Sequence, residues 1–174
     1  AEARALAGLA RSLAERPENG LEALARTIVE MGLAGSACVS LLDPSGQCFR
    51  WSATAGAWAR HAGRVMPYGA SPCAVVLDAA APLLFRQPHE TFPALVGEPP
   101  INEVLLMPFR LEGNLVGTVW ALSHGSERRF DAEDARLLDS LSSLAAAAHK
   151  LAHAAEVLAA DGQRQAFRLS LTER

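Results

Sequence analysis

Basic charge is scarce and scattered in this chain of 174 residues. Lys150 is the only lysine, Arg128 and Arg129 form the only adjacent basic pair, and the formal net charge is −3. A nucleic-acid-binding protein needs a concentrated basic face, so we expect no nucleic-acid partner. The apolar runs stop well short of the roughly 20 residues that a membrane-spanning helix requires. With no signal peptide visible either, we expect no membrane contact by this chain.

Cysteine is also sparse. Cys38, Cys48 and Cys73 are the three cysteines, and their odd number and wide spacing argue against a disulfide framework or a zinc site. If the first strand pair closes at the turn Asp43–Gly46, Cys38 would face about Trp51 and not Cys48, which excludes a bond between these two thiols. We therefore expect free thiols in a reducing cytoplasm.

Hydrophobic periodicity and turn residues predict an α+β domain. Strands that follow one another and are joined by tight turns favour an antiparallel sheet, so helices at both chain ends must cover one of its faces. The sequence predicts helices over 2–15, 21–31 and 71–80, strands over 36–42, 47–53, 64–68 and 82–86, an irregular loop over 87–101, and a hairpin over 102–124.

The stretch from Asn102 to Leu158 is the most informative part of the chain. Two apolar strands are predicted to meet at a turn formed by Gly113 and Asn114. After them, Asp131 is a suitable N-cap and is followed by further acidic residues, which favour a helix start. The helix that begins there is expected to run to about Ala160.

Apolar residues recur in this long helix with alternating steps of four and three. The pattern lasts about three heptads, near the minimum that argues for a coiled coil. A helix packed only on its own sheet is the alternative, but beyond about residue 150 too little chain remains to cover an apolar stripe. We expect a parallel homodimer that the first helix joins. The interface residues would be Leu6, Leu9, Leu13, Leu141, Leu144, Ala148, Leu151, Ala155 and Leu158.

Several segments, in this order and spacing, resemble a GAF domain, a relative of PAS domains found in bacterial sensor kinases. The resemblance implies an antiparallel sheet of five or six strands, with terminal helices packed on one face and a small-ligand pocket under short helices and loops on the other. The matching segments are Ala37–Asp43, Ser71–Cys73, Pro82–Phe85, Val104–Phe109, Gly117–Ala121 and Phe130–Asp134.

The same resemblance divides the chain into three parts. Residues 1–19 would be a helix of the dimer bundle, 20–150 the GAF domain, and 151–174 a signalling helix that leads into a following module. Because the chain begins without Met and ends in a polar helical segment, we expect it to be a piece of a longer protein whose output domain lies elsewhere on the same chain.

The pocket would be lined by aromatic and polar side chains, although such side chains often fill a core instead. Ser71 is expected to cap a helix whose first turn holds Cys73. The helix start would lower the thiol pKa if Cys73 were exposed, and the alternative is a small buried hydrophobe. The candidate ligand-binding residues are Trp51, Ser71, Cys73, Phe85, His89, Phe92, Met107 and Trp120.

Histidines give little support for a metal site. His149 and His153 share a helix face but lack further ligands, so we interpret them as exposed helix residues. His89 lies in the proline-rich loop and is a candidate ligand contact or haem ligand. The identity of any cofactor or ligand stays unknown.

Three functions are compatible with these features. The first is a non-catalytic sensory domain of a bacterial sensor kinase, which binds a small molecule and transmits through its dimeric C-terminal helix. The second is a thiol-based reductase of free methionine sulfoxide that uses Cys73. Residues 87–101 contain no cysteine, however, so the resolving thiol is missing. The third is a structural dimerisation module with a filled pocket and no ligand.

Overall fold

Six strands form one antiparallel sheet in the computed structural model of the protein, which describes residues 1–172. The predicted α+β class and the antiparallel pairing are confirmed. The spatial order is β3-β2-β1-β6-β5-β4, so β1 and β6 lie in the centre and pair with each other. The strands are β1 (Ser36–Leu42), β2 (Cys48–Gly56), β3 (Val65–Pro67), β4 (Leu83–Arg86), β5 (Glu103–Leu111) and β6 (Asn114–Ser123).

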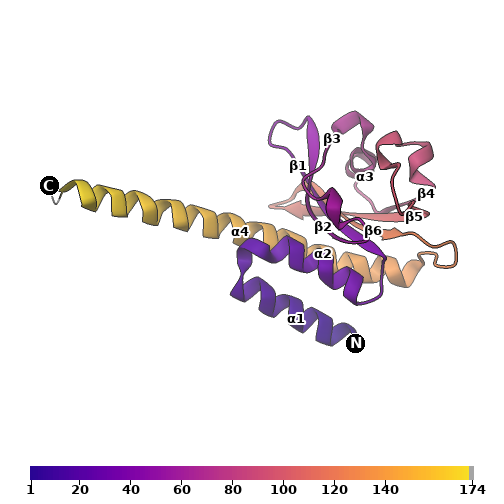
Figure 1. Ribbon diagram of the computed structural model, residues 1–174, viewed down its shortest axis with the longest axis horizontal. Coiled ribbons are helices and arrows are strands. Elements are labelled where there is room, and N and C mark those ends of the chain that lie inside the picture. Colours follow the sequence, from indigo (N-terminus) through magenta and orange to yellow (C-terminus); the bar gives the residue numbers. More distant parts are fainter. Residues whose placement is uncertain (173–174) are drawn as a thin grey trace.

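Helices cover both faces of this sheet. Helix α2 and the first half of α4 lie on one face, with α1 and the turn of residues 17–19 packed against these two helices, whereas α3 and the short helical turns between residues 59 and 95 lie on the other (Figure 1). The second half of α4 projects beyond the body of the molecule (Figure 1). The helices are α1 (Glu2–Glu15), α2 (Gly20–Glu30), α3 (Pro72–Ala79) and α4 (Ala132–Thr172), with 3-10 turns η1 (Pro17–Asn19), η2 (Ala59–His61), η3 (Tyr68–Ala70), η4 (Pro88–Glu90) and η5 (Pro93–Leu95).

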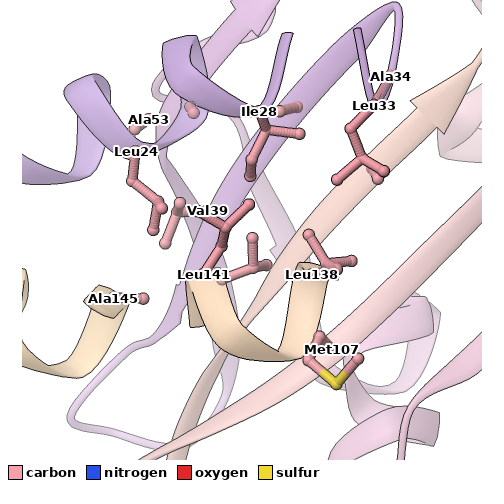
Figure 2. Packing of buried hydrophobic residues seen from close by; sticks show 14 of the residues in the cluster. Leu24, Ile28, Leu33, Ala34, Val39, Ala53, Met107, Leu138, Leu141 and Ala145 are labelled. Carbon is pink, nitrogen blue, oxygen red and sulfur yellow. The ribbon is translucent and has the colours of Figure 1, made fainter. Parts of the chain in front are cut away.

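The face under the terminal helices holds one of two hydrophobic clusters, which we call the helix-side core. Leu24 and Ile28 point from α2, and Leu138 and Leu141 point from α4, towards Val39 of the sheet (Figure 2). Residues three or four apart share one face of a helix, which explains why these side chains meet. Each large aliphatic side chain buried there contributes about 2 kcal/mol.

Helix α4 is longer than its sequence predicts, since it continues to Thr172 instead of ending near Ala160. Gly162 is the poorest helix former in this extension. A glycine inside a helix costs only about 1 kcal/mol relative to alanine. The good helix formers on both sides of it therefore carry the helix through.

The β5–β6 hairpin turns one residue earlier than predicted. Leu111 pairs with Asn114, so Glu112 and Gly113 form the turn, with φ angles of 52° and 83°. Two successive positive φ angles match the twist of the flanking strands in a two-residue hairpin. The predicted turn at Gly113 and Asn114 is therefore wrong.

The β1–β2 register also differs from the expectation. Cys38 pairs with Thr54, and Trp51 pairs with Ser40. The pair nearest the turn is Leu42 with Phe49, so the connection is two residues longer than a turn at Asp43–Gly46 allows, and a register shift between Val39 and Ser40 adds a third residue. Such a bulge adds one residue to one strand and displaces every pair beyond it. The further conclusion that Cys38 and Cys48 are not opposite each other is confirmed, and all three cysteines are free.

Gly117 lies where β6 passes close to β1, and we predict that Gly117→Ala destabilises the fold. A Cβ atom there would lie 2.3 Å from the Ser40 carbonyl oxygen and 2.8 Å from the Phe109 ring. Since a paired backbone carbonyl cannot move away, we expect the free energy of unfolding to fall by about 3 kcal/mol. Urea unfolding followed by tryptophan fluorescence measures it.

Gly125→Ala is the matched control, because nothing lies within 4 Å of a Cβ atom at that position. Equal stability of the two variants would contradict the close approach of β6 to β1.

Candidate functional site

Three tryptophans form the centre of the second hydrophobic cluster, on the face of the sheet away from the terminal helices. Trp51 comes from β2, Trp120 from β6, and Trp58 from the turn before η2; all three are 0% exposed. The Trp51 ring lies 5.1 Å from that of Trp120 and 6.0 Å from that of Trp58, measured between centroids. We call this group the tryptophan cluster. The cluster lies on the face where the resemblance places a ligand pocket.

Two of the three indole N–H groups have acceptors. Trp120 Nε1 donates to Thr118 Oγ1 at 2.8 Å, and Trp58 Nε1 donates to the Pro99 carbonyl oxygen at 2.8 Å. Trp51 Nε1 is buried and has no partner among residues 1–172. A buried donor without an acceptor is costly, so this nitrogen is the least satisfied part of the cluster.

The loop between β4 and β5 is fastened over the tryptophan cluster by three donors. Arg60 donates to the carbonyl of Glu98, Trp58 to that of Pro99, and His124 Nδ1 lies 2.9 Å from that of Pro100. We call these three contacts the loop latch. Sequence reasoning missed Arg60 and His124, because both act on backbone carbonyls that no side-chain motif reveals.

His124 has a defined tautomer in this arrangement. Its Nδ1 must donate to the Pro100 carbonyl, so in the neutral ring Nε2 accepts from the Ser36 hydroxyl at 2.7 Å. The Ser36 oxygen in turn accepts the backbone N–H of Trp58 at 3.0 Å. The start of β1, the end of β6 and the latched loop are thereby joined by one hydrogen-bonded chain.

Cys73 is a buried thiol. Ser71 caps α3 as predicted, and its Oγ accepts the Cys73 backbone N–H at 3.1 Å. Cys73 Sγ lies 3.1 Å from Thr118 Oγ1 and is 0% exposed. Burial raises the pKa of this thiol, outweighing the hydrogen bonds from Ser71 and Thr118 that lower it. The alternative of an exposed, acidic thiol is therefore wrong, and that of a small buried residue is confirmed.

The remaining candidates for the pocket are scattered. Phe85 and Phe92 meet edge to face with ring centroids 5.4 Å apart and pack against the tryptophan cluster. Met107 points to the opposite face, into the helix-side core, because successive side chains of a strand alternate. His89 lies in η4, is partly exposed and does not belong to the buried cluster.

A hollow of about 660 Å³ lies on the helical side of the molecule, between α1, α2 and Leu137 of α4. Across residues 1–172, no group of three or more His, Cys, Asp or Glu side chains could hold a metal ion. Within the same residues, every helix is too short or too polar for a bilayer.

The residues expected at a dimer interface fall into three groups. Leu9, Leu13, Leu141 and Ala148 are buried within a single protomer, because α1 folds back onto α2 and α4. Their assignment to the interface is wrong. Leu6 and Leu144 are partly buried against the same helix-side core. Beyond them, Leu151 and Leu158 are 45% and 73% exposed, and Ala155 lies between them on the same face.

A comparison with protein-family models matches residues 14–149 to the GAF domain. The chain belongs to the GAF family. A comparison with curated proteins finds no match.

Solved structures agree with this fold at low sequence identity. The GAF domain of a phosphoenolpyruvate-protein phosphotransferase from Coxiella burnetii has a TM-score of 0.75 and 19% identity, over 90% of this chain and 96% of that one. Free methionine-R-sulfoxide reductase from Neisseria meningitidis, solved with its substrate, has a TM-score of 0.73 and 16% identity, over 88% and 91%. The second GAF domain of DevS from Mycobacterium smegmatis has a TM-score of 0.65 and 18% identity, over 82% of this chain and 99% of that one.

We predict that native-state thiol labelling modifies Cys48 quickly and the other two cysteines slowly. Cys48 is partly exposed, whereas Cys38 and Cys73 are buried. Burial raises the pKa of Cys38 to about 12 and also raises that of Cys73, so both stay protonated at neutral pH and only the thiolate reacts. Mass spectrometry after a short iodoacetamide pulse measures the order.

Cys48→Ser should abolish the fast phase, and labelling in urea should reach every remaining thiol. Rapid native labelling of Cys73 would contradict the buried environment.

Proposed function

We propose that this chain is a non-catalytic sensory GAF domain of a bacterial signalling protein, acting as a parallel dimer that transmits through α4. The observation that carries the proposal is the division of α4. Its first half packs on the domain's own sheet, and its second half exposes apolar side chains to solvent. A helix that packs on the sheet at one end and extends from the domain at the other can pass a movement of the sheet to an output domain beyond α4.

The exposed half of α4 needs a partner. Leu151, Ala155 and Leu158 continue the heptad seam, and Phe167 and Leu169 are each 65% exposed further along. Large apolar side chains gathered on one projecting helix are a feature of interaction surfaces. A second copy of the same helix supplies an equivalent stripe at the same height, which is the packing of a parallel coiled coil.

The beginning of α4 is tied to the sheet through a buried carboxylate. Glu103 of β5 is 2% exposed. Its Oε1 accepts from Arg86 of β4 at 3.1 Å, and its Oε2 accepts the backbone N–H of Phe130 at 3.0 Å. A shift of β4 or β5 would therefore displace the backbone immediately before α4.

A small ligand would act by changing the balance between two packings of the domain. Ligand binding moves such a balance only if the two states differ in affinity. The loop latch over the tryptophan cluster is the element that a ligand would have to move, since it covers the packed face. We place this function in the cytoplasm, with an output domain such as a kinase beyond α4.

A reductase is disfavoured by the thiol environment. Cys73 is buried against Thr118, and the loop 87–101 offers no second thiol. The fold is shared with free methionine-R-sulfoxide reductases, but thiol exchange needs an accessible attacking thiolate and a resolving partner.

A dimerisation module without a ligand is the second candidate function. The close packing of three fully buried tryptophans favours it. A thermal-shift screen of metabolites separates the two candidates: stabilisation by one compound supports the sensor, and none supports the structural module.

We predict that the chain is a dimer and that Leu151→Glu combined with Leu158→Glu makes it monomeric. Both side chains lie on the exposed seam, where paired carboxylates would repel and could not be buried. Light scattering coupled to size exclusion measures the mass. Because neither side chain belongs to a buried cluster, the unfolding midpoint of the monomeric domain should change little.

Val157→Glu is the matched control. This exposed side chain is next to Leu158 but off the seam, so the variant should remain a dimer. A dimer that survives the double substitution, or a chain ending at Lys150 that stays fully dimeric, would contradict the role of distal α4.

A further inference from the structure

Three buried nitrogen atoms without hydrogen-bond partners belong to neighbouring side chains at one edge of the tryptophan cluster. They are Trp51 Nε1, His61 Nε2 and Arg64 Nη1. The Trp51 and His61 ring centroids are 6.3 Å apart, and the Arg64 guanidinium carbon lies 5.6 Å from the centre of the Trp51 ring. Buried polar atoms normally have partners, so three orphans on neighbouring side chains call for a common explanation.

The three orphans can all be donors. The indole and guanidinium nitrogens carry only protons to donate. Burial, followed by the charges of Arg64 and Arg60, lowers the pKa of His61, so the ring is neutral at pH 7. A neutral imidazole still donates from one nitrogen, and Nε2 is free to be that nitrogen. What is missing from this edge is therefore an acceptor.

Positive charge accompanies these donors. Arg60 and Arg64 both lie near His61, and neither forms a salt bridge with a carboxylate in the described part of the chain. His61 and Arg64 are partly exposed, whereas Trp51 is 0% exposed. The edge thus combines a buried donor with a cationic border that reaches the surface of the molecule.

We propose that this edge is a subsite for the carboxylate group of a small molecule, held by Trp51 Nε1, His61 Nε2 and Arg64 Nη1. A carboxylate brings two oxygens with several lone pairs and one negative charge, which matches several donors and an unpaired cation. The subsite lies beside Trp58, which holds the loop latch. A carboxylate bound there would act on the contact between Trp58 and Pro99, which holds the loop over the tryptophan cluster. The subsite rests on the proposed sensory function and gives it a ligand class, small carboxylates.

The indole protons report this subsite directly. The chain has three tryptophans, and all of them belong to the cluster. In a titration with sodium formate or acetate at constant ionic strength, we expect a saturable shift of the Trp51 indole N–H resonance. Those of Trp58 and Trp120, which already have acceptors, should move less. Trp51→Phe identifies the resonance.

Arg64→Gln should weaken the apparent affinity by at least about tenfold, the usual effect of removing a charged hydrogen-bond partner. Arg60→Gln should weaken it less, because its guanidinium is bound to the Glu98 carbonyl. Arg11→Gln removes the same charge from an exposed position on α1, so it is the matched control and should leave the affinity unchanged.

Several outcomes would overturn the carboxylate subsite. One is a Trp51 resonance that ignores formate and acetate, which would mean that water satisfies these donors. Another is an equal response to chloride or inorganic phosphate, which would mean an adventitious ion only. An unchanged affinity in Arg64→Gln is a third. None of these results would affect the dimerisation test of α4, so failure of the subsite and of the dimeric sensor can be told apart.

Discussion

Burial on both faces of the central strands is the constraint on which the rest of the structure depends. Strands β1 and β6 are covered by terminal helices on one side and by the tryptophan cluster on the other, and their side chains alternate between the two. Both hydrophobic cores therefore share these strands, and neither can be repacked without affecting a strand that the other core uses. Glu103 adds a polar connection from the sheet to the start of α4.

Much of the fold follows from sequence patterns, and the failures have identifiable causes. The strands, the antiparallel pairing and the Ser71 cap depend on local chemistry that a single sequence contains. The β1–β2 register does not, because the connection from Leu42 to Phe49 is longer than the turn residues indicate and a further register shift follows between Val39 and Ser40. The heptad pattern correctly identified an apolar stripe on α4, but it could not tell which part of that stripe the same chain covers.

The candidate site was less predictable than the fold. Trp51 and Trp120 were expected in it and lie together, whereas Met107 faces the other core. Arg60 and His124 were missed because they bind backbone carbonyls of a loop whose path depends on the whole fold. Aromatic residues are visible in a sequence, but whether they surround a cavity or fill it depends on side-chain packing.

The length of α4 gives it a mechanical property. Residues 151–172 continue as uninterrupted helix past the body of the domain, and at 1.5 Å per residue this lever arm measures about 33 Å. Tilting the helix by about 5° at residue 151 would therefore move residue 172 by about 3 Å. A displacement at the sheet too small to disturb either packed layer would reach the far end of the helix as a movement of atomic size.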